Sequence, residues 1–341
     1  MYVAPRPEAE DDPLFAVRLA TGVAVALLTA LMVQTTLPTL MPAIIFSLMA
    51  GMRKAFNPKK GIIGPIILSV IMTLFSALVS LVLPMPLVLV LVMGGIATIA
   101  YYLILRTGNP IGMLLLVGTV LMSVMGMNSV TAMNMMRDAL VEAGIAAAVI
   151  IPVLYVIFPA GTNEQAEEDY TPAQGGQYWL RAVIRGVVLM ALMLWLYSVI
   201  DASNIILVLA AVFVLVFPSR KKLFAEAWER TVATLLGGCA TVAILTIFYF
   251  CAHPPILLGM MFLVALFFAH RMMTGHRAPM VYQFACSVMI ALTISAIFSN
   301  SALSSIVLRI VLTLTGAMVA AFVTSLLEAL LLKGETLASS R

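Results

Sequence analysis

Charged residues are scarce in this sequence. They make up 10% of its 341 residues, whereas 63% are hydrophobic and the mean hydropathy is +1.11. A soluble domain carries about 25% charged residues, so this composition is not that of a chain folded to face water. The lipid bilayer is the solvent that it fits, and its length is best measured as a number of membrane spans.

Residues that commonly carry chemistry are also few. The three histidines have no metal-ligand spacing, and the three cysteines form no Cys-x-x-Cys pair. No glycine-rich phosphate loop, Walker motif or nucleophile elbow occurs. We therefore expect no enzyme activity, no catalytic residue, no metal and no cofactor. The basic residues form no face interleaved with aromatic residues, which argues against nucleic acid as a partner.

Long apolar runs are what the sequence does have, and proline and glycine separate them. About 20 apolar residues suffice to cross the hydrocarbon core. The first half offers runs at 16–35, 38–52, 61–83, 86–105, 111–127 and 134–158, and the second at 180–200, 203–218, 228–251, 254–270, 278–298 and 302–332. These runs predict an all-α polytopic membrane protein with about twelve transmembrane helices. The second run of each half is short, a feature that can mark a functional region in repeat-built transporters.

Arginines and glycines recur at fixed spacings in the two halves. The pairs that are 167 residues apart include Arg18 with Arg185 and Arg53 with Arg220. The pairs that are 172 residues apart are Arg137 with Arg309 and Gly144 with Gly316. Such recurrence indicates a duplicated unit. We predict two parallel six-helix repeats, 1–158 and 179–341, joined by a hydrophilic cytoplasmic linker at 159–178.

The distribution of lysine and arginine predicts the orientation of the chain in the membrane. If the N-terminus is inside, the inner loops and helix ends carry 17 of the 19 basic residues. Both termini of this multi-pass membrane protein are then cytoplasmic. The first residues lack the layout of a cleavable signal peptide, so we expect the first apolar run to stay as a span.

Arg137 and Arg309 are the two basic residues left on the outer side. Each precedes a glycine by seven residues, Gly144 and Gly316, which lies on the same helix face and allows another backbone to approach closely. An arginine within the membrane costs roughly 2.5–3.5 kcal/mol on insertion scales. Two symmetry-related arginines could flank one cavity and bind an organic anion, because guanidinium grips carboxylate bidentately. Alternatively, each arginine reaches the outer headgroups.

Asp138 and Glu142 lie four residues apart in the sixth run, on one helix face. Two carboxylates so close in a low-dielectric setting cannot both ionise cheaply, which suits a proton-coupling site. The second half has no equivalent acids, and drift in one copy would explain that as well. Asp138 also follows Arg137 directly, so the two side chains should point in different directions and need not pair. We expect Glu328, near the end of the last run, to reach the inner interface.

A family resemblance rests on the segment Arg230-Thr-Val-Ala-Thr-Leu-Leu-Gly-Gly238. It resembles the Arg-x-x-Gly-Thr-x-x-Gly signature of the fusaric acid resistance and aromatic acid exporter superfamily, at the start of the third span. Ala233 replaces the first glycine, whereas Thr234 and Gly237 fit. The basic loop after the second span of each unit is similar too. Larger exporters carry a soluble domain after six spans, so this chain resembles compact members of the superfamily.

The resemblance implies efflux of aromatic or other organic acids, driven by the proton gradient. It also implies a small organic anion as substrate and a periplasmic adaptor protein of the membrane-fusion type as partner. A passive anion channel and a membrane scaffold that only recruits an adaptor protein are the alternatives. Whether the protein forms a homo-oligomer stays open.

Overall fold

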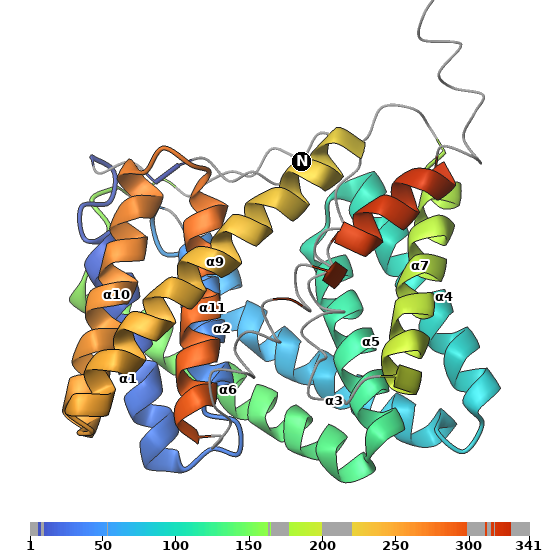
Figure 1. The fold of residues 1–341 in the computed structure, drawn as a ribbon, viewed down its shortest axis with the longest axis horizontal. Coiled ribbons are helices and arrows are strands. Elements are labelled where there is room, and N and C mark those ends of the chain that lie inside the picture. Colours follow the sequence, from blue (N-terminus) through green and yellow to red (C-terminus); the bar gives the residue numbers. More distant parts are fainter. Residues whose placement is uncertain are drawn as a thin grey trace, which may run out of the picture.

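The protein is described from a computed structural model (Figure 1). The structure describes residues 6–7, 10–52, 54–162, 164, 177–199, 220–298, 311, 315–316 and 318–328, and only the backbone of 110, 196–199, 220–227 and 298. All regular elements of these residues are helices, which confirms the all-α prediction.

The first half forms six helices and one π-helical turn. They are α1 (Phe15–Val33), α2 (Leu40–Gly51), η1 (Lys59–Ile63), α3 (Gly64–Val82), α4 (Pro86–Thr107), α5 (Pro110–Asn128) and α6 (Val130–Ile157). The second half forms α7 (Tyr178–Val199), α9 (Arg220–Phe250), α10 (Pro254–Thr274), α11 (Pro279–Phe298) and the helix Met318–Glu328. The predicted run 203–218 lies outside the described residues.

Proline and polar caps set several helix boundaries. Proline occupies the first position of α4, α5, α10 and α11, where its missing N–H would have no intrahelical partner. Gly108 ends α4 in the left-handed conformation, at a φ of 66°. The side chain of Asn109 then caps α5 by accepting a hydrogen bond from the Ile111 amide at 3.0 Å. The chain therefore turns sharply between α4 and α5.

Nine helices of the described region are long and apolar enough to cross a membrane. The short second run is confirmed, because α2 has 12 residues and is about 18 Å long at 1.5 Å per residue. The hydrocarbon core is about 30 Å thick, so α2 alone cannot cross it. The protein is thus a multi-pass membrane protein in which at least one apolar helix is only partly spanning.

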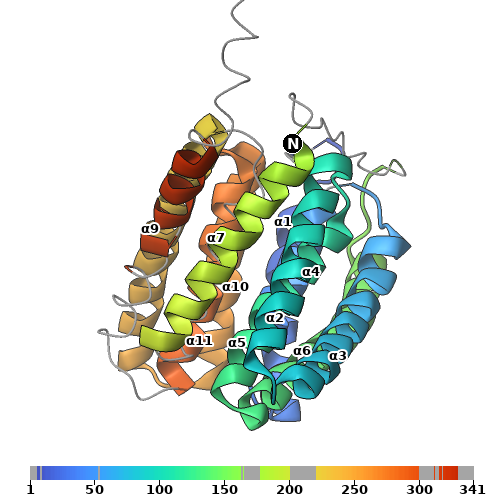
Figure 2. The same cartoon turned by 90° about the vertical axis from the view of Figure 1, so that its right-hand side faces the viewer.

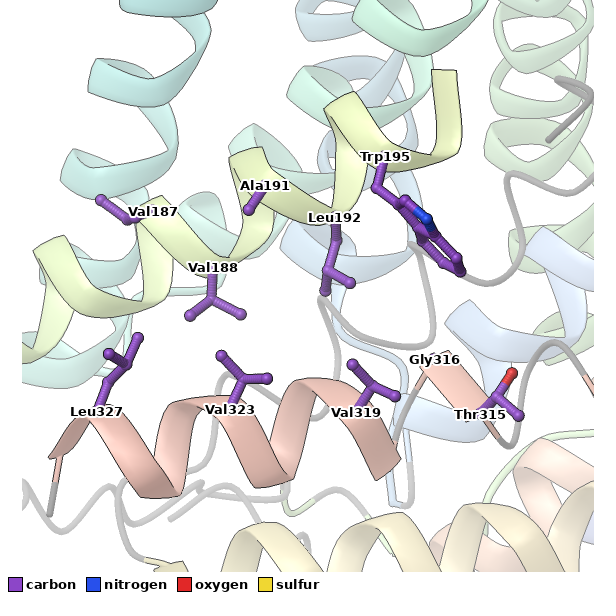
Figure 3. A pocket seen from close by; sticks show the side chains of 10 residues that line it. All are labelled: Val187, Val188, Ala191, Leu192, Trp195, Thr315, Gly316, Val319, Val323 and Leu327. Carbon is purple, nitrogen blue, oxygen red and sulfur yellow. The ribbon is translucent and has the colours of Figure 1, made fainter. Parts of the chain in front are cut away.

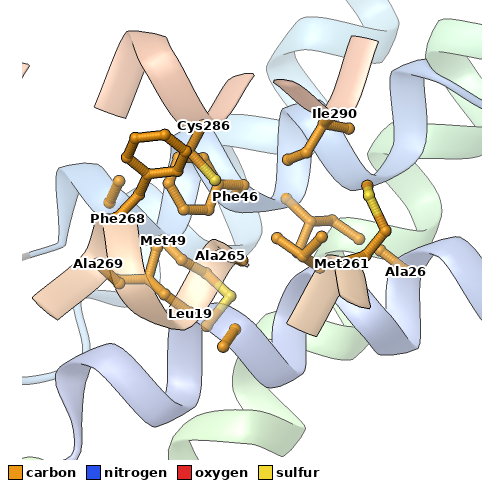
Figure 4. Packing of buried hydrophobic residues seen from close by; sticks show 14 of the residues in the cluster. Leu19, Ala26, Phe46, Met49, Met261, Ala265, Phe268, Ala269, Cys286 and Ile290 are labelled. Atoms are coloured by element: carbon orange, nitrogen blue, oxygen red, sulfur yellow. The ribbon is translucent and has the colours of Figure 1, made fainter. Parts of the chain in front are cut away.

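Two hydrophobic cores hold the helices together, and both draw on the two halves of the chain. The first core combines α1, α2 and the second part of α6 with α9, α10 and α11. Figure 4 shows its packing among α1, α2, α10 and α11. The second combines α3, α4, α5 and the first part of α6 with α7 and the Met318–Glu328 helix. Within this arrangement α1 packs along α10, and α4 packs along α7 (Figures 1 and 2). The two halves are therefore interleaved rather than side by side.

Four segments predicted to face the cytoplasm meet at one end of the molecule. Arg6 donates hydrogen bonds to the carbonyls of Gly275 and Arg277, in the loop between α10 and α11. Lys54 pairs with Asp11 at 3.1 Å and with Glu164 at 3.2 Å. The hydrogen bonds to Asp11 and Glu164 raise the pKa of Lys54. The segment before α1, the loop after α2 and the start of the predicted linker are thus joined.

Candidate functional site

The predicted outer site lies in the first half of α6, and its arginine is paired. Arg137 donates to Asp138 Oδ1 from Nε at 2.8 Å and from Nη2 at 2.7 Å, and Nη1 donates to Asn134 Oδ1 at 3.2 Å. The expectation that Arg137 and Asp138 need not pair is wrong. The long arginine side chain bends back across the helix surface to its short neighbour, which overcomes the divergence of their Cβ directions.

The two acids occupy the exposed side of α6. Asp138 and Glu142 share one side of a continuous helix, and Asp138 is 55% exposed. The same side carries the exposed Ile145, Val149 and Val156, whereas the opposite side is buried in the two cores. Glu142 is half-buried, and its Oε2 atom is buried with no hydrogen-bond partner among the described residues. The acids therefore face away from both cores.

Gly144 marks a close crossing of α6 and α3, as its position on the helix predicted. A Cβ atom added there would collide with the Ser69 hydroxyl and lie 3.0 Å from the Pro65 carbonyl oxygen. Its predicted counterpart Gly316 is buried and lines a cavity. Arg309 lies outside the described residues, so whether it shares a site with Arg137 stays a prediction.

Arg18 is a buried charge that the sequence reasoning counted as an inner basic residue and as a repeat landmark, without assigning it a partner. It is 1% exposed in α1 and pairs through two nitrogens with Asp12 in the preceding segment. Arg18 Nη1 also donates to the Phe158 carbonyl at 2.9 Å, and the guanidinium lies 3.9 Å from the centre of the Tyr155 ring. Burial raises the pKa of the Asp12 carboxyl, and the Arg18 guanidinium opposes that shift.

Arg185, 167 residues later, is buried in the same way. It is 0% exposed in α7, and its Nη2 atom donates to Glu328 Oε1 at 3.0 Å. The prediction that Glu328 reaches the inner interface is wrong, because Glu328 is itself only 4% exposed. Its partner is on another helix, which no local charge pattern could reveal. The recurrence of Arg18 and Arg185 at one spacing was the only signal in the sequence.

An apolar cavity of about 400 Å³ lies between α7 and the Met318–Glu328 helix (Figure 3). Trp195 and Thr315 lie toward one end and Val187 and Leu327 toward the other. Leu327 directly precedes Glu328, and Val187 follows Arg185 by two residues. The buried Arg185–Glu328 pair thus borders one end of this cavity.

A second cavity, of about 480 Å³, lies at the opposite end of the molecule from the Lys54 contacts. It is lined by the turns that precede α4 and α6, including Pro86, Asn128 and Ser129, and by Leu194 of α7. These turns are the predicted outer loops. The start of α6, which carries the Arg137 site, thus adjoins a partly polar hollow.

The signature-like segment of α9 forms one face of that helix, packed on α11. Arg230 is buried and lies 3.9 Å from the centre of the Phe284 ring. One and two turns later, Thr234 is buried, and a Cβ atom on Gly237 would lie 2.5 Å from the Ala285 carbonyl oxygen. The signature positions therefore build a tight helix crossing, and Ala233, in place of the first glycine, is buried there as well.

Residues 182–323 match the family model described as fusaric acid resistance protein-like. This match confirms the superfamily resemblance over the second half of the chain. Members of the family are membrane transport proteins rather than enzymes. No curated protein and no solved structure matches the chain.

The region that matches the family model, 182–323, covers much of the second half of the chain. It includes most of α7, the signature face of α9 and residues 318–323 of the Met318–Glu328 helix. Of the repeat landmarks, Arg53 lies outside the described residues, and Arg220 is described only by its backbone at the start of α9. No group of three metal-ligating side chains occurs among the described residues.

Proposed function

We propose that the protein is a secondary transporter of the bacterial inner membrane that exports organic anions, aromatic acids among them, in a proton-coupled manner. The match of 182–323 to a fusaric acid resistance protein-like family is the observation that carries this proposal. The helices long enough to span a membrane and the charges held among them support it. A non-transporting scaffold would have no need of ionisable groups within the membrane.

The transport unit that we propose has twelve spans in two parallel repeats, with both termini cytoplasmic. The packing of α1 on α10 and of α4 on α7 supports the repeat, because in each case the first helix of one half meets the fourth helix of the other. The contacts among Arg6, Lys54 and the predicted inner loops support one common cytoplasmic end. A periplasmic adaptor protein of the membrane-fusion type is the proposed partner.

Arg137 and Arg309 are the proposed anion-binding residues. Arg137 is already arranged to grip a carboxylate, since two of its nitrogens converge on one oxygen of Asp138. An organic anion would compete with Asp138 for this arginine. Asp138 and Glu142 are the proposed proton-coupling acids, and Asp138 released from Arg137 is a carboxylate that can take up a proton.

Reconstituted vesicles with an imposed pH gradient test this function against its alternatives. We expect accumulation of an aromatic carboxylate such as p-aminohippurate that collapses when an uncoupler is added. Flux that ignores the pH gradient and follows voltage would indicate a passive anion channel instead. If neither p-aminohippurate nor citrate moves when a membrane-fusion adaptor is present, the result would favour a membrane scaffold that does not transport.

A further inference from the structure

The two buried arginines, Arg18 and Arg185, differ in whether the polar groups near them are hydrogen-bonded. Arg18 contacts both carboxylate oxygens of Asp12 and the Phe158 carbonyl, and the Tyr155 hydroxyl beside it donates to the Met52 carbonyl at 3.0 Å. Asp12 lies in the segment before α1, outside the apolar span. The polar groups of this cluster hydrogen-bond to one another and to nearby carbonyls, and they hold the start of α1 against the inner end of α6.

The polar groups around Arg185 and Glu328 are arranged differently. Tyr101 of α4 and Thr324, one turn before Glu328, are both fully buried. Their hydroxyls, and that of Ser325, have no hydrogen-bond partner among the described residues. Tyr101 is close enough for the charge of Arg185 to act on its hydroxyl. Buried polar groups are seldom left unbonded, so these hydroxyls need an explanation.

Stability is a poor explanation for the Arg185–Glu328 pair. Two charges lose their hydration when buried, and replacing a buried ion pair by apolar residues is often neutral or stabilising. Ionisable residues within membrane spans are instead a default indication of function. Hydroxyls both donate and accept hydrogen bonds, so a hydroxyl such as that of Thr324, one turn before Glu328, suits a neighbouring acid in its charged or its neutral form.

The position of Glu328 complements that of the outer acids. Arg185 lies two turns after the start of α7, the helix that follows the predicted cytoplasmic linker, whereas Asp138 and Glu142 lie near the outer start of α6. Among the described residues, the titratable group that bonds to Glu328 is Arg185 on α7. Tyr101 on α4 lies near Arg185, and Arg181 lies one turn before Arg185. A proton that crosses the membrane needs an acceptor on each side of its centre.

We propose that Glu328 is the proton-accepting carboxylate of the inner half of the membrane, and that Arg185 holds it while it is deprotonated. This inference is carried by the buried bond between Arg185 and Glu328 and by the unbonded hydroxyls of Thr324, one turn before Glu328, and of Tyr101, near Arg185. It rests on the proposed proton-coupled transport. Protonation neutralises Glu328 and breaks the ion pair with Arg185.

The test separates proton movement from anion movement in the same vesicles. A trapped pH-sensitive dye reports proton flux when p-aminohippurate is added, and isotopic exchange of p-aminohippurate at equal pH reports anion movement alone. Glu328→Gln should lower the proton flux per transported anion by about tenfold or more. Exchange at equal pH should persist. Glu328→Asp keeps an ionisable group and should retain coupling.

The matched control is Asp12→Asn, which breaks the corresponding pair of Arg18 and should leave the proton-to-anion ratio unchanged. Because Glu328→Gln leaves Arg185 buried without its carboxylate, the double variant Arg185→Gln with Glu328→Gln provides a neutral pair if the single variant does not fold. It should show the same loss of proton flux and the same exchange.

Wild-type coupling in either Gln variant would overturn the proposal, and so would loss of exchange in a folded double variant, which would show that the pair is structural. Failure of the proposed function looks different, because addition of p-aminohippurate would then produce no proton flux even in the wild-type protein. An infrared difference spectrum between acid and neutral pH gives a readout that does not depend on transport. It should contain a C=O band of a buried neutral carboxyl that is absent from Glu328→Gln, and its presence in that variant would contradict the assignment.

Discussion

Arg137 is the residue at which we propose that an incoming anion binds. Its guanidinium is bound by Asp138 and Asn134, yet the side chain remains 30% exposed. An organic carboxylate therefore gains a bond to Arg137 only by displacing Asp138 or by sharing the guanidinium with it. The fork of donors is what makes sharing possible, because a lysine ammonium is a point charge with no second, parallel donor.

We expect Arg137→Gln to impair anion transport while leaving expression intact. Removing one cationic partner of a desolvated carboxylate costs on the order of 2–5 kcal/mol, or some tenfold to several-thousandfold in affinity. Arg137→Lys should also fail, since the bidentate contact is lost. Initial rates of p-aminohippurate exchange over a range of concentrations measure the effect as a rise in KM.

The corresponding changes at Arg309 provide the comparison within the same chain. If the two arginines share one site, Arg309→Gln and Arg309→Lys should resemble the Arg137 variants. Full activity in both lysine variants would eliminate the bidentate site and favour arginines that only reach the headgroups. Unchanged exchange in both Gln variants would eliminate anion binding at these positions.

At the scale of elements, the signature residues of α9 allow that helix to pack closely on α11. Thr234 and Gly237 follow Arg230 on the face that packs on α11, and Thr241 extends that face by one more turn. Thr241 donates a long hydrogen bond of 3.4 Å to the Met289 carbonyl of α11. Helices in lipid associate through close packing and hydrogen bonds of this kind, since lipid tails remove the usual hydrophobic driving force. The signature residues thus form a close helix crossing between α9 and α11.

Gly237→Ala should destabilise the protein, because its Cβ atom would lie 2.5 Å from a backbone oxygen that cannot move away freely. Overpacking of this kind costs about 1–3 kcal/mol. Gly95→Ala is the matched control, since a Cβ atom at Gly95 in α4 would meet nothing within 4 Å. Alanine there should be neutral or stabilising by up to about 1 kcal/mol. Thermal unfolding in detergent compares the two, and equal midpoints would refute the tight crossing.

The helix positions were largely predictable from the sequence. Hydropathy places most helix ends within a few residues, because a lipid-facing helix must be apolar along its length and proline interrupts such runs. The prediction failed where a helix leaves the apolar region. The run 228–251 missed the first eight residues of α9, which begins at Arg220 with two polar, charged turns. Composition cannot distinguish such turns from a loop.

The candidate site was less predictable than the helices. The shared face of Asp138 and Glu142 follows from helical periodicity within one element, and the structure agrees with it. The pairing of Arg185 with Glu328 joins residues 143 positions apart on different helices. Such a contact depends on tertiary packing, which spacing along the chain does not determine.

At the scale of the whole molecule, the interleaved cores tie the two halves into one unit. Gly186 of α7 crosses Thr98 of α4 so closely that a Cβ atom on the glycine would collide with the threonine hydroxyl. Gly94 of the same helix adjoins Met190 of α7, and α10 packs along α1 in the other core. If the halves were separated, the faces of α4 and α7 that carry these glycines would lie in lipid and lose the closely packed helix that the glycines allow to approach.

The chain cut between Tyr170 and Thr171, within the predicted linker, should consequently assemble only from both parts. Residues 1–170 and 171–341 expressed alone should each give a heterogeneous profile in size-exclusion chromatography, because each half lacks the partner of its first and fourth helices. Coexpression should restore a single peak, and a tag on either part should co-purify the other. The cut keeps both buried ion pairs, because Arg18 and Asp12 lie in the first part and Arg185 and Glu328 lie in the second. A cut between Ala143 and Gly144, inside α6, is the matched control and should not be rescued, since it divides the helix that contributes to both cores. If either part alone forms a monodisperse, thermally stable species, the halves are independent domains, and the packing of α1 on α10 and of α4 on α7 is not needed for folding.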